Sequence, residues 1–364
     1  MASAPPSGPL PIWTWVWPVV AWFILGIGSI YGMPAYVAAA AAIALMATVF
    51  AAVHHAEVVA HRIGEPFGTL VLAMAVTIIE VALIVSVMLA DPPSKAGLAR
   101  DTVFSAVMIV CNGIVGLSLL VGGVRHHVQG FQIQGASAAL AVLAPLTVLT
   151  LVIPNYTMSL PGPVFSPSQL VFASIVSLVL YGAFIFVQTV RHRDYFLPEV
   201  IHPATEDHAT PPDRSAAAIS LALLVVSLVA IVGLAKFLSP FVEAGISSVN
   251  APSAVAGIVI AGLVLLPEGL AALRAARANR LQNSLNLALG SALASIGLTI
   301  PVVAAVGLAI GLPLQLGLEP KDQLLLLLTI VLGVITLGTG RTTVLQGIVH
   351  LVVFAAFVFF AVVP

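Results

Sequence analysis

The sequence predicts an all-α polytopic membrane protein with about eleven transmembrane helices. Of its 364 residues, 60% are hydrophobic and only 7% are charged, and a soluble domain of this size could not bury so much apolar surface. Apolar runs follow one another along the chain, most of them about 20 residues long, which is the length that a helix needs to cross a bilayer. The longest hydrophilic segment, 191–214, is rich in proline, histidine and charge and is typical of a loop.

Composition also limits the partners of the chain. A net charge of −1 gives no reason to expect nucleic acid or an acidic partner. The single cysteine, Cys111, lies in an apolar run and excludes a disulfide framework. The first residues, MASAPPSGPLP, contain no Lys or Arg, so we expect no cleaved signal peptide. We therefore expect a lipid bilayer and small inorganic ions as partners and no cofactor, while the sequence leaves the oligomeric state open.

Eleven predicted spans can be placed along the chain, with four tryptophans near its start that fit an interfacial belt. The spans are roughly 12–32, 34–53, 67–90, 102–122, 131–153, 168–190, 215–238, 252–274, 283–308, 321–338 and 342–363. Ten or twelve spans are the alternatives, because 12–53 is nearly continuous and 321–363 is divided only at Gly338–Thr342.

The predicted spans divide into an N-terminal helix and two equal halves. Segment 1–33 holds the first span, 34–190 holds five, 191–214 is a cytoplasmic loop, and 215–364 holds five more. The third and eighth spans occupy corresponding places and would cross the membrane in opposite directions. Inverted repeats of this kind are typical of secondary transporters.

Two glutamates stand out because each lies in the middle of an apolar span. Phe67–Ala90 contains Glu80 as its one ionisable side chain, and Pro252–Arg274 contains Glu268 as its one carboxylate. The other twelve of the fourteen Asp and Glu residues are predicted in loops or at span ends. A charge at the centre of a bilayer costs roughly 2.5 kcal/mol or more on insertion scales. We therefore predict that Glu80 and Glu268 are functional and together form a cation site at the midplane.

The chemistry of two facing carboxylates favours exchange. A hard cation prefers several oxygen ligands, and two glutamates supply up to four together with two negative charges. The same carboxylates can bind protons instead. A cation and protons that exclude each other from one site are the minimum that an antiporter needs.

Neighbouring polar side chains are candidates for additional oxygen ligands. Thr77 lies three residues before Glu80, and Asn112 shares a helical face with Ser105. Ser291 and Ser295 recur at helical spacing with Ser284 and Thr299 in the ninth span. The alternative is that these small polar residues are helix-packing surface. Pro267 leaves the Leu263 carbonyl without its helical donor, which indicates either a broken helix at an ion site or a plain kink.

Histidines suggest a different class of protein. His54, His55 and His61 precede the third span, and His126 and His127 follow the fourth. A membrane metalloenzyme could use such a cluster, although the repeated close spacings of a di-metal site are missing from the sequence. Interfacial histidines without a metal are the simpler interpretation.

Two stretches, GEPFGTLVLAMAVTIIEVALIVSVML at 64–89 and LLPEGLAALRAARANRLQNSLNLALGSALASIGLTIP at 265–301, resemble the α-repeats of the calcium/cation antiporter superfamily. The likeness extends to RHRDYFLPE at 191–199 and is closest to the ChaA-type bacterial sodium–calcium/proton antiporters. It implies an eleven-helix fold, with the ion site between α-repeats at about 64–122 and 252–308 and with Glu80 and Glu268 as the exchanging carboxylates. It also implies that Asn112 and Ser291 are polar residues on the helices that follow.

One departure concerns cation selectivity. The better-known cation/proton exchangers carry Asn three residues before each glutamate, where this chain has Thr77 and Leu265. We therefore expect a secondary antiporter of the inner membrane that exchanges cytoplasmic Ca²⁺, with Na⁺ or K⁺ as further substrates, for external protons. A mainly monovalent cation/proton antiporter is the alternative, and a metalloenzyme that uses the cytoplasmic histidines is the third interpretation.

The distribution of Lys and Arg predicts the orientation. A cytoplasmic N-terminus places nine basic residues inside and four outside, which agrees with the positive-inside rule. The C-terminus then lies outside. A reporter that fluoresces only in the cytoplasm should stay dark when it is fused after Pro364. A bright fusion would contradict either the orientation or the odd number of spans.

Overall fold

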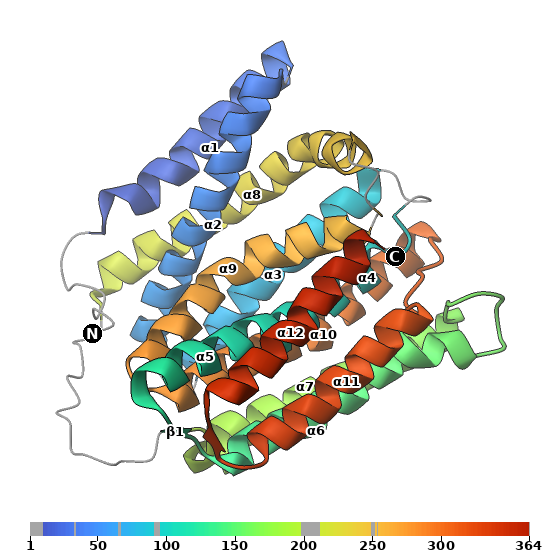
Figure 1. Cartoon of the computed structure of the whole chain (residues 1–364). Helices are drawn as coiled ribbons and strands as arrows, with labels where there is room; N and C mark the ends of the chain where they lie inside the picture. The colour runs from blue at the N-terminus through green and yellow to red at the C-terminus, as the bar shows by residue number, and fades with distance from the viewer. Residues whose placement is uncertain are drawn as a thin grey trace. The chain divides into compact units, whose positions relative to one another are not determined.

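The structure is a computed structural model that describes residues 10–32, 34–64, 67–90, 95–197, 212–248, 252 and 254–363. These residues are almost entirely helical (Figure 1). The chain forms two compact units, of which unit 1 comprises 1–91 and 202–250 and unit 2 comprises 92–201 and 251–364. Each unit is described by itself.

The described residues of unit 1 form four long helices. They are α1 (Ile12–Tyr31), α2 (Ala35–Ile63), α3 (Phe67–Ala90) and α8 (Arg214–Ser248). Helix α2 packs against each of the other three, and its many alanines allow the close approach. The Trp22 indole donates a hydrogen bond to the Val226 carbonyl at 3.2 Å, which ties α1 to α8. Gly32 and Gly64 end α1 and α2 with φ of 78° and 75°, a conformation that glycine adopts without strain.

Unit 2 contains the remaining helices and one pair of short strands. Its elements are α4 (Leu98–Met108), η1 (Ile109–Ile114), α5 (Val115–His126), β1 (Gln129–Gly130), α6 (Ile133–Thr147), η2 (Val148–Val152), η3 (Ile153–Tyr156), α7 (Pro167–Phe186), η4 (Val187–Arg191), η5 (Arg193–Phe196), α9 (Ala254–Arg277), α10 (Leu281–Ile310), α11 (Pro320–Leu337), β2 (Arg341–Thr342) and α12 (Val344–Val362). Strands β1 and β2 are antiparallel, with Gln129 opposite Thr342.

Helix α10 is the core of unit 2. It packs against α4, α6, α7 and α9, and most of its side chains are buried. The sequence explains this position, because 281–310 contains no Asp, Glu, Lys or Arg and is mostly small or apolar. Its three serines and Thr299 are buried inside the protein, whereas Asn283 near its start is exposed.

The fold class is confirmed, and each of the eleven predicted spans coincides with a helical segment. Within the described residues, ten helical segments are long and apolar enough to cross a membrane, and Ala73–Leu89 of α3 is a shorter apolar stretch. Two predicted boundaries were wrong. Helix α2 continues to Ile63 and α8 to Ser248, so Glu57 and Glu243 lie within helices and not in loops. Charged residues near a helix end can reach water, so they do not end the helix.

The two compact units group the helices differently from the predicted repeats, since each unit takes segments from both halves of the sequence. The division into repeats stays a prediction. Most of the predicted loop 191–214 lies outside the described residues.

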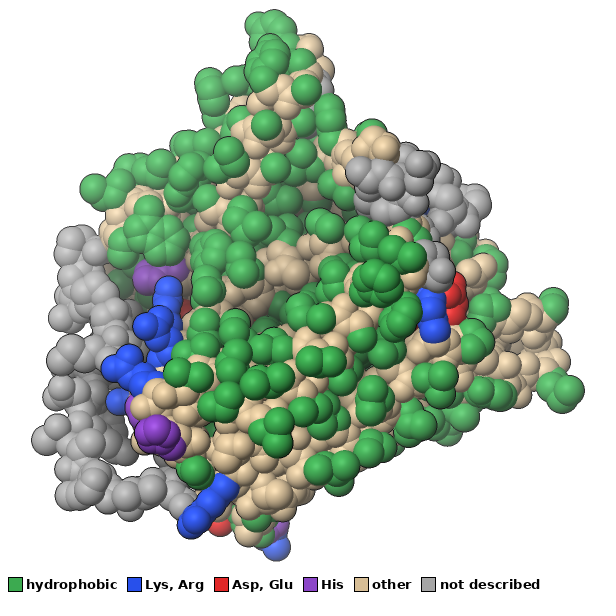
Figure 2. Space-filling model, viewed as in Figure 1, with side chains coloured by type: hydrophobic (Ala, Val, Ile, Leu, Met, Phe, Trp, Pro, Cys, Tyr) green, Lys and Arg blue, Asp and Glu red, His purple; other side chains and the backbone are tan. Residues whose placement is uncertain are grey.

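Basic residues gather at one end of unit 2, where α5 and α9 end (Figure 2). The His126 ring lies 3.0 Å from the Arg277 carbonyl, and Gln129 donates to the Ala276 carbonyl at 2.9 Å. Strand pairing brings Arg341 to the same end. Arg100 lies at the other end of the α4–η1–α5 segment, where it donates to the Gly317 carbonyl at 3.2 Å. The membrane orientation of these two ends stays a prediction.

Glycines allow α5 and α12 to meet backbone to backbone. A Cβ added at Gly347 would lie 2.8 Å from Leu120 Cα, and one added at Gly116 would lie 2.9 Å from His350 Cβ. Real Cβ atoms do not approach other atoms so closely, so a larger residue would have to push the two helices apart.

This contact gives a stability prediction. We expect Gly347→Ala to destabilise the protein by about 1–3 kcal/mol, because overpacking against rigid backbone cannot relax through a side-chain rotation. Thermal unfolding of the purified protein in detergent measures the change. The matched control is Gly182→Ala in α7, where no heavy atom lies within 4 Å of the added Cβ. Equal melting temperatures for the two variants would contradict the close contact.

Candidate functional site

Glu80 lies near the middle of α3 in unit 1. Its side chain is 2% exposed, and the neighbouring Ile79 and Ile84 are buried as well. Thr77, one turn earlier, is 5% exposed, and its hydroxyl donates to the Ala73 carbonyl at 2.9 Å. Thr77 and Glu80 are therefore buried together on one helix, as the spacing predicted. The Thr77 hydroxyl donates its hydrogen to a carbonyl of its own helix, and its oxygen lone pairs can accept a further interaction.

Glu268 lies near the middle of α9 in unit 2. It is 6% exposed, and the Ser291 hydroxyl of α10 donates a hydrogen bond to Glu268 Oε2. The structure thus brings together two residues that are 23 positions apart in sequence and that were both predicted for the site. A hydroxyl that donates to a carboxylate fixes its orientation.

The helix around Glu268 is continuous. Helix α9 runs from Ala254 to Arg277 with Pro267 inside it, so the interpretation as a broken helix was wrong for this segment. Pro267 still has no N–H to offer, so the Leu263 carbonyl lacks its usual helical donor one turn away.

The serine face of α10 is buried, as predicted. Ser284, Ser295 and Thr299 are 1%, 2% and 0% exposed and lie on the same side as Ser291. This face therefore lies in the interior of unit 2, and its Ser291 hydroxyl contacts Glu268.

Asn112 is hydrogen-bonded to residues that were not predicted for the site. It lies in η1, a π-helical segment between α4 and α5, and its side chain is fully buried. Asn112 Nδ2 donates to Thr329 Oγ1 at 2.8 Å, and Asn112 Oδ1 lies 3.1 Å from His350 Nδ1. Thr329 and His350 belong to α11 and α12. Asn112 is therefore the centre of a polar network that joins three parts of unit 2.

The segment η1 also contacts the helix of Glu268. It packs against α9 and α10, and the Ile114 side chain lies 3.1 Å from the position that a Cβ on Gly269 would occupy. Gly269 is the residue after Glu268. Short π-helical segments within α-helices are often found at functional sites, and this one packs against the helix that carries Glu268.

His350 is the residue that the sequence reasoning missed. It is the one ionisable side chain of α12, and it is 1% exposed. The signal that identified Glu80 and Glu268, a lone ionisable group inside an apolar span, applies equally to His350. His350 lies far in sequence from the histidines near the predicted cytoplasmic ends of spans and forms no cluster with them in the sequence.

The predicted histidine cluster has structural roles. The His55 ring is buried and lies 3.0 Å from the Thr14 carbonyl, and the His54 ring contacts the Trp13 ring at 5.4 Å between centroids. Both contacts join α1 to α2. Among the residues that the structure describes, no group of three or more His, Cys, Asp or Glu side chains could hold a metal ion. The metalloenzyme interpretation therefore finds no support in these contacts.

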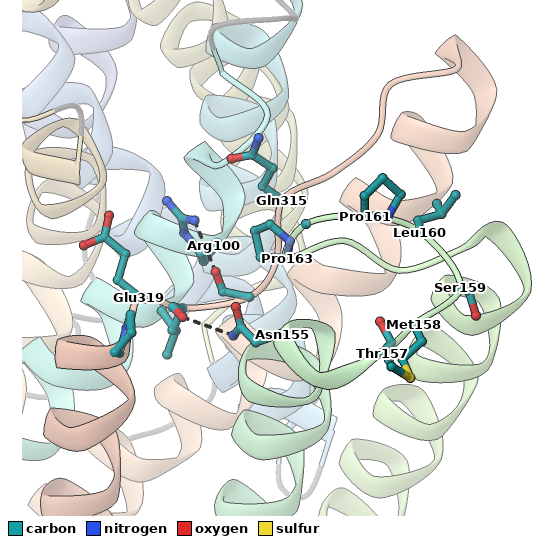
Figure 3. A pocket seen from close by; sticks show the side chains of 14 residues that line it. Arg100, Asn155, Thr157, Met158, Ser159, Leu160, Pro161, Pro163, Gln315 and Glu319 are labelled. Carbon is teal, nitrogen blue, oxygen red and sulfur yellow. Dashed lines mark hydrogen bonds between the residues drawn. The ribbon is translucent and has the colours of Figure 1, made fainter.

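A separate pocket of about 890 Å³ opens among the loops at the end of unit 2 where α4 begins (Figure 3). Arg100, Asn155, Gln315 and Glu319 are among its lining residues. Asn155 donates to the Leu318 carbonyl at 3.1 Å and so holds two of the loops together. None of the six predicted site residues lines this pocket, so it is distinct from the buried glutamates.

An all-helical membrane fold with a lone carboxylate buried in the middle of an apolar helix is typical of transport proteins. The family described as "Sodium/calcium exchanger protein" matches residues 33–190 and 219–363. The chain belongs to this family, whose members are secondary transporters and not enzymes.

Two relatives are similar over nearly their whole length. The chain is 50% identical to y4hA of Sinorhizobium fredii, which is named as a candidate ionic transporter, over 98% of both chains. It is 37% identical to the sodium-potassium/proton antiporter ChaA of Escherichia coli over 94% of both chains.

Solved structures share the fold at low sequence identity. YfkE matches with a TM-score of 0.74 and 16% identity over 96% of this chain and 100% of that one. The H⁺/Ca²⁺ exchanger CAX matches with a TM-score of 0.70 and 13% identity over 95% of this chain and 87% of that one. These likenesses confirm the polytopic helical fold.

Proposed function

We propose that this chain is an antiporter of the inner membrane that exchanges cytoplasmic Ca²⁺ for external protons, with Glu80 and Glu268 as the exchanging carboxylates. The observation that carries the proposal is that each unit buries one glutamate in the middle of an apolar helix, 2% exposed in α3 and 6% exposed in α9. Membership of the sodium/calcium exchanger family supports it.

The cost of a bare charge explains why transport would be coupled. Two ionised glutamates are unfavourable inside an apolar protein in a bilayer unless positive charge accompanies them. One divalent cation or two protons restores the balance equally well. The state without either ligand is therefore unfavourable. The carrier moves its site from one side of the membrane to the other only with a cation or with protons bound, so it does not leak ions.

Neutral oxygens would complete the cation's shell. Ser291 already contacts Glu268 and is the first candidate. Ser295 lies one helical turn further along the same buried face, and Thr77 lies beside Glu80. Asn112 is the fourth candidate, because its segment packs against α9 and α10. Ca²⁺ takes six to eight oxygen ligands, so several such groups are needed in addition to carboxylates.

A mainly monovalent cation/proton antiporter is the second candidate function. The relative at 37% identity is named a sodium-potassium/proton antiporter. In addition, Leu265 is apolar and buried at the position three residues before Glu268, where it offers no side-chain oxygen. Everted vesicles with an imposed ΔpH separate the candidates when Ca²⁺, Na⁺ and K⁺ are added in turn. Dequenching by Na⁺ and K⁺ but not by Ca²⁺ would select the second function.

The central prediction concerns the glutamates. Glu80→Gln and Glu268→Gln should each abolish cation/proton exchange while leaving the protein folded and inserted. The amide keeps the shape and one oxygen, but it carries no charge and takes up no proton. Asn112→Ala and Ser291→Ala should weaken apparent cation affinity without abolishing transport. The dequenching rate in everted vesicles, normalised to the amount of inserted protein, measures both effects.

The matched control is Glu319→Gln. Glu319 directly precedes α11. Its side chain is 58% exposed, and its carboxylate lies 3.2 Å from Lys321 Nζ. Its loss should leave the exchange rate nearly unchanged, because exposed ion pairs contribute little. Wild-type exchange by Glu80→Gln or Glu268→Gln would refute the assignment.

Competition between cation and protons gives the pH dependence. If both ligands use the same carboxylates, apparent cation affinity should fall as pH decreases, because protonation removes the cation's ligands. The affinity can be measured from the cation concentration that gives half-maximal dequenching at a series of pH values. A constant affinity from mildly alkaline to mildly acidic pH would mean that cations and protons bind at different groups.

A further inference from the structure

The polar network around Asn112 in unit 2 has a defined hydrogen-bond direction. Thr329 Oγ1 lies 2.7 Å from the Leu325 carbonyl and 3.3 Å from Met108 Sδ, and it donates its one hydrogen to one of them. When Thr329 donates to the Leu325 carbonyl, its oxygen accepts from Asn112, whose amide nitrogen Nδ2 lies 2.8 Å away. The amide oxygen Oδ1 then faces His350. The structure has the Asn112 amide in this orientation, which keeps the Thr329 hydrogen bond within α11.

The same argument fixes the proton on the His350 ring. An amide oxygen only accepts hydrogen bonds, so His350 Nδ1, at 3.1 Å from Asn112 Oδ1, carries the hydrogen. His350 Nε2 lies 3.2 Å from Thr336 Oγ1, whose hydroxyl can donate to it. Both ring nitrogens are thus satisfied in the neutral imidazole, although the side chain is buried in an apolar helix.

The backbone holds the ring in this place. Gly116 lets α12 approach α5 so closely that an added Cβ would lie 2.9 Å from His350 Cβ. Gly116 follows η1 by two residues, so the contact positions His350 directly beside the π-helical segment. The ring therefore bridges η1 and α11 from a fixed position on α12.

We infer that His350 is a positioning residue for cation exchange: by donating from Nδ1 to Asn112 it holds the Asn112 oxygen, and with it the η1 segment, in the orientation that serves the cation site. This inference rests on the proposed function. An Asn112 amide without this donor is free to turn and to present N–H groups, which repel a cation, in place of its oxygen. Oδ1 has two lone pairs, and His350 occupies one of them, so the other remains available.

The position of η1 explains how the loss of the His350–Asn112 hydrogen bond would affect Glu268. The Ile114 side chain of η1 packs on Gly269, directly after Glu268, and η1 also packs on α10, which carries Ser291. A shift of η1 would therefore be transmitted to the helices of both members of the Glu268–Ser291 pair.

Two conservative substitutions separate the two ring nitrogens. In H350N the side-chain amide nitrogen takes the place of Nδ1, so it can still donate to Asn112. In H350Q the amide reaches the place of Nε2, so it can contact Thr336 but not Asn112. We expect H350Q to raise the KM for the cation about three- to tenfold with Vmax per inserted molecule nearly unchanged, as for the loss of one buried hydrogen bond. We expect H350N to restore the KM to within about twofold of wild type.

The matched control is H126Q, which makes the same change at a histidine that lies at the end of α5 and contacts the Arg277 carbonyl. Its KM should equal that of wild type. A wild-type KM in H350Q, an equal loss in H350N and H350Q, or a fall in Vmax with unchanged KM in both would overturn the positioning role. The proposed function fails separately, if Glu268→Gln retains exchange.

A spectroscopic measurement keeps the inference testable if a variant does not fold. In wild-type protein with ¹⁵N-labelled histidine, NMR should find the His350 proton on Nδ1. The signal should change in Asn112→Ala, because the acceptor is removed. A proton on Nε2 in the wild-type protein would overturn the inference.

Discussion

The cost of burying a carboxylate in an apolar environment is the constraint on which the structure depends. A charged side chain in the middle of a membrane helix is retained only where polar partners or a counter-ion compensate it. In unit 2 the compensation is visible, since the Ser291 hydroxyl donates to Glu268 from α10, most of whose side chains are buried. Helix α10 can place a hydroxyl there because its sequence is uncharged throughout. Helix α10 thus contributes both to the apolar core of unit 2 and to the polar surroundings of Glu268.

Much of this arrangement could be predicted from the sequence, because the relevant signals are local. The apolar runs fix the helices, and the isolation of Glu80 and Glu268 within such runs marks them without any knowledge of packing. The pairing of Ser291 with Glu268 was also within reach, because the spacing of the serines defined one face of α10 and the resemblance to a known family placed that face near the ion site. Whether each glutamate binds a cation is a question that these signals raise and that exchange measurements answer.

Other features could not be predicted, because they depend on contacts between distant segments. The π-helical form of 109–114 has no sequence signature of its own; it arises where Asn112, Thr329 and His350 meet. The true ends of α2 and α8 were missed for a different reason. Hydropathy falls where Glu57 and Glu243 occur, but a helix continues as long as its backbone hydrogen bonds are satisfied, whatever the polarity of its side chains. Hydropathy therefore locates the membrane-crossing part of a helix and not its ends.

The two kinds of buried polar group in unit 2 meet the same constraint in different ways. Glu268 carries a charge that a hydroxyl alone does not neutralise, so it is suited to a ligand that comes and goes. The Asn112 network is neutral, and each of its described hydrogen bonds has a donor and an acceptor, so it is stable without any ligand. A hydrogen-bonded neutral network of this kind is rigid, because rotating any member breaks hydrogen bonds that water cannot replace in an apolar interior. A transporter needs both properties close together: a charged group that binds an ion, and a rigid structure that holds the charged group in position. The contact of Ile114 in η1 with Gly269 connects the segment of the Asn112 network to the helix of Glu268.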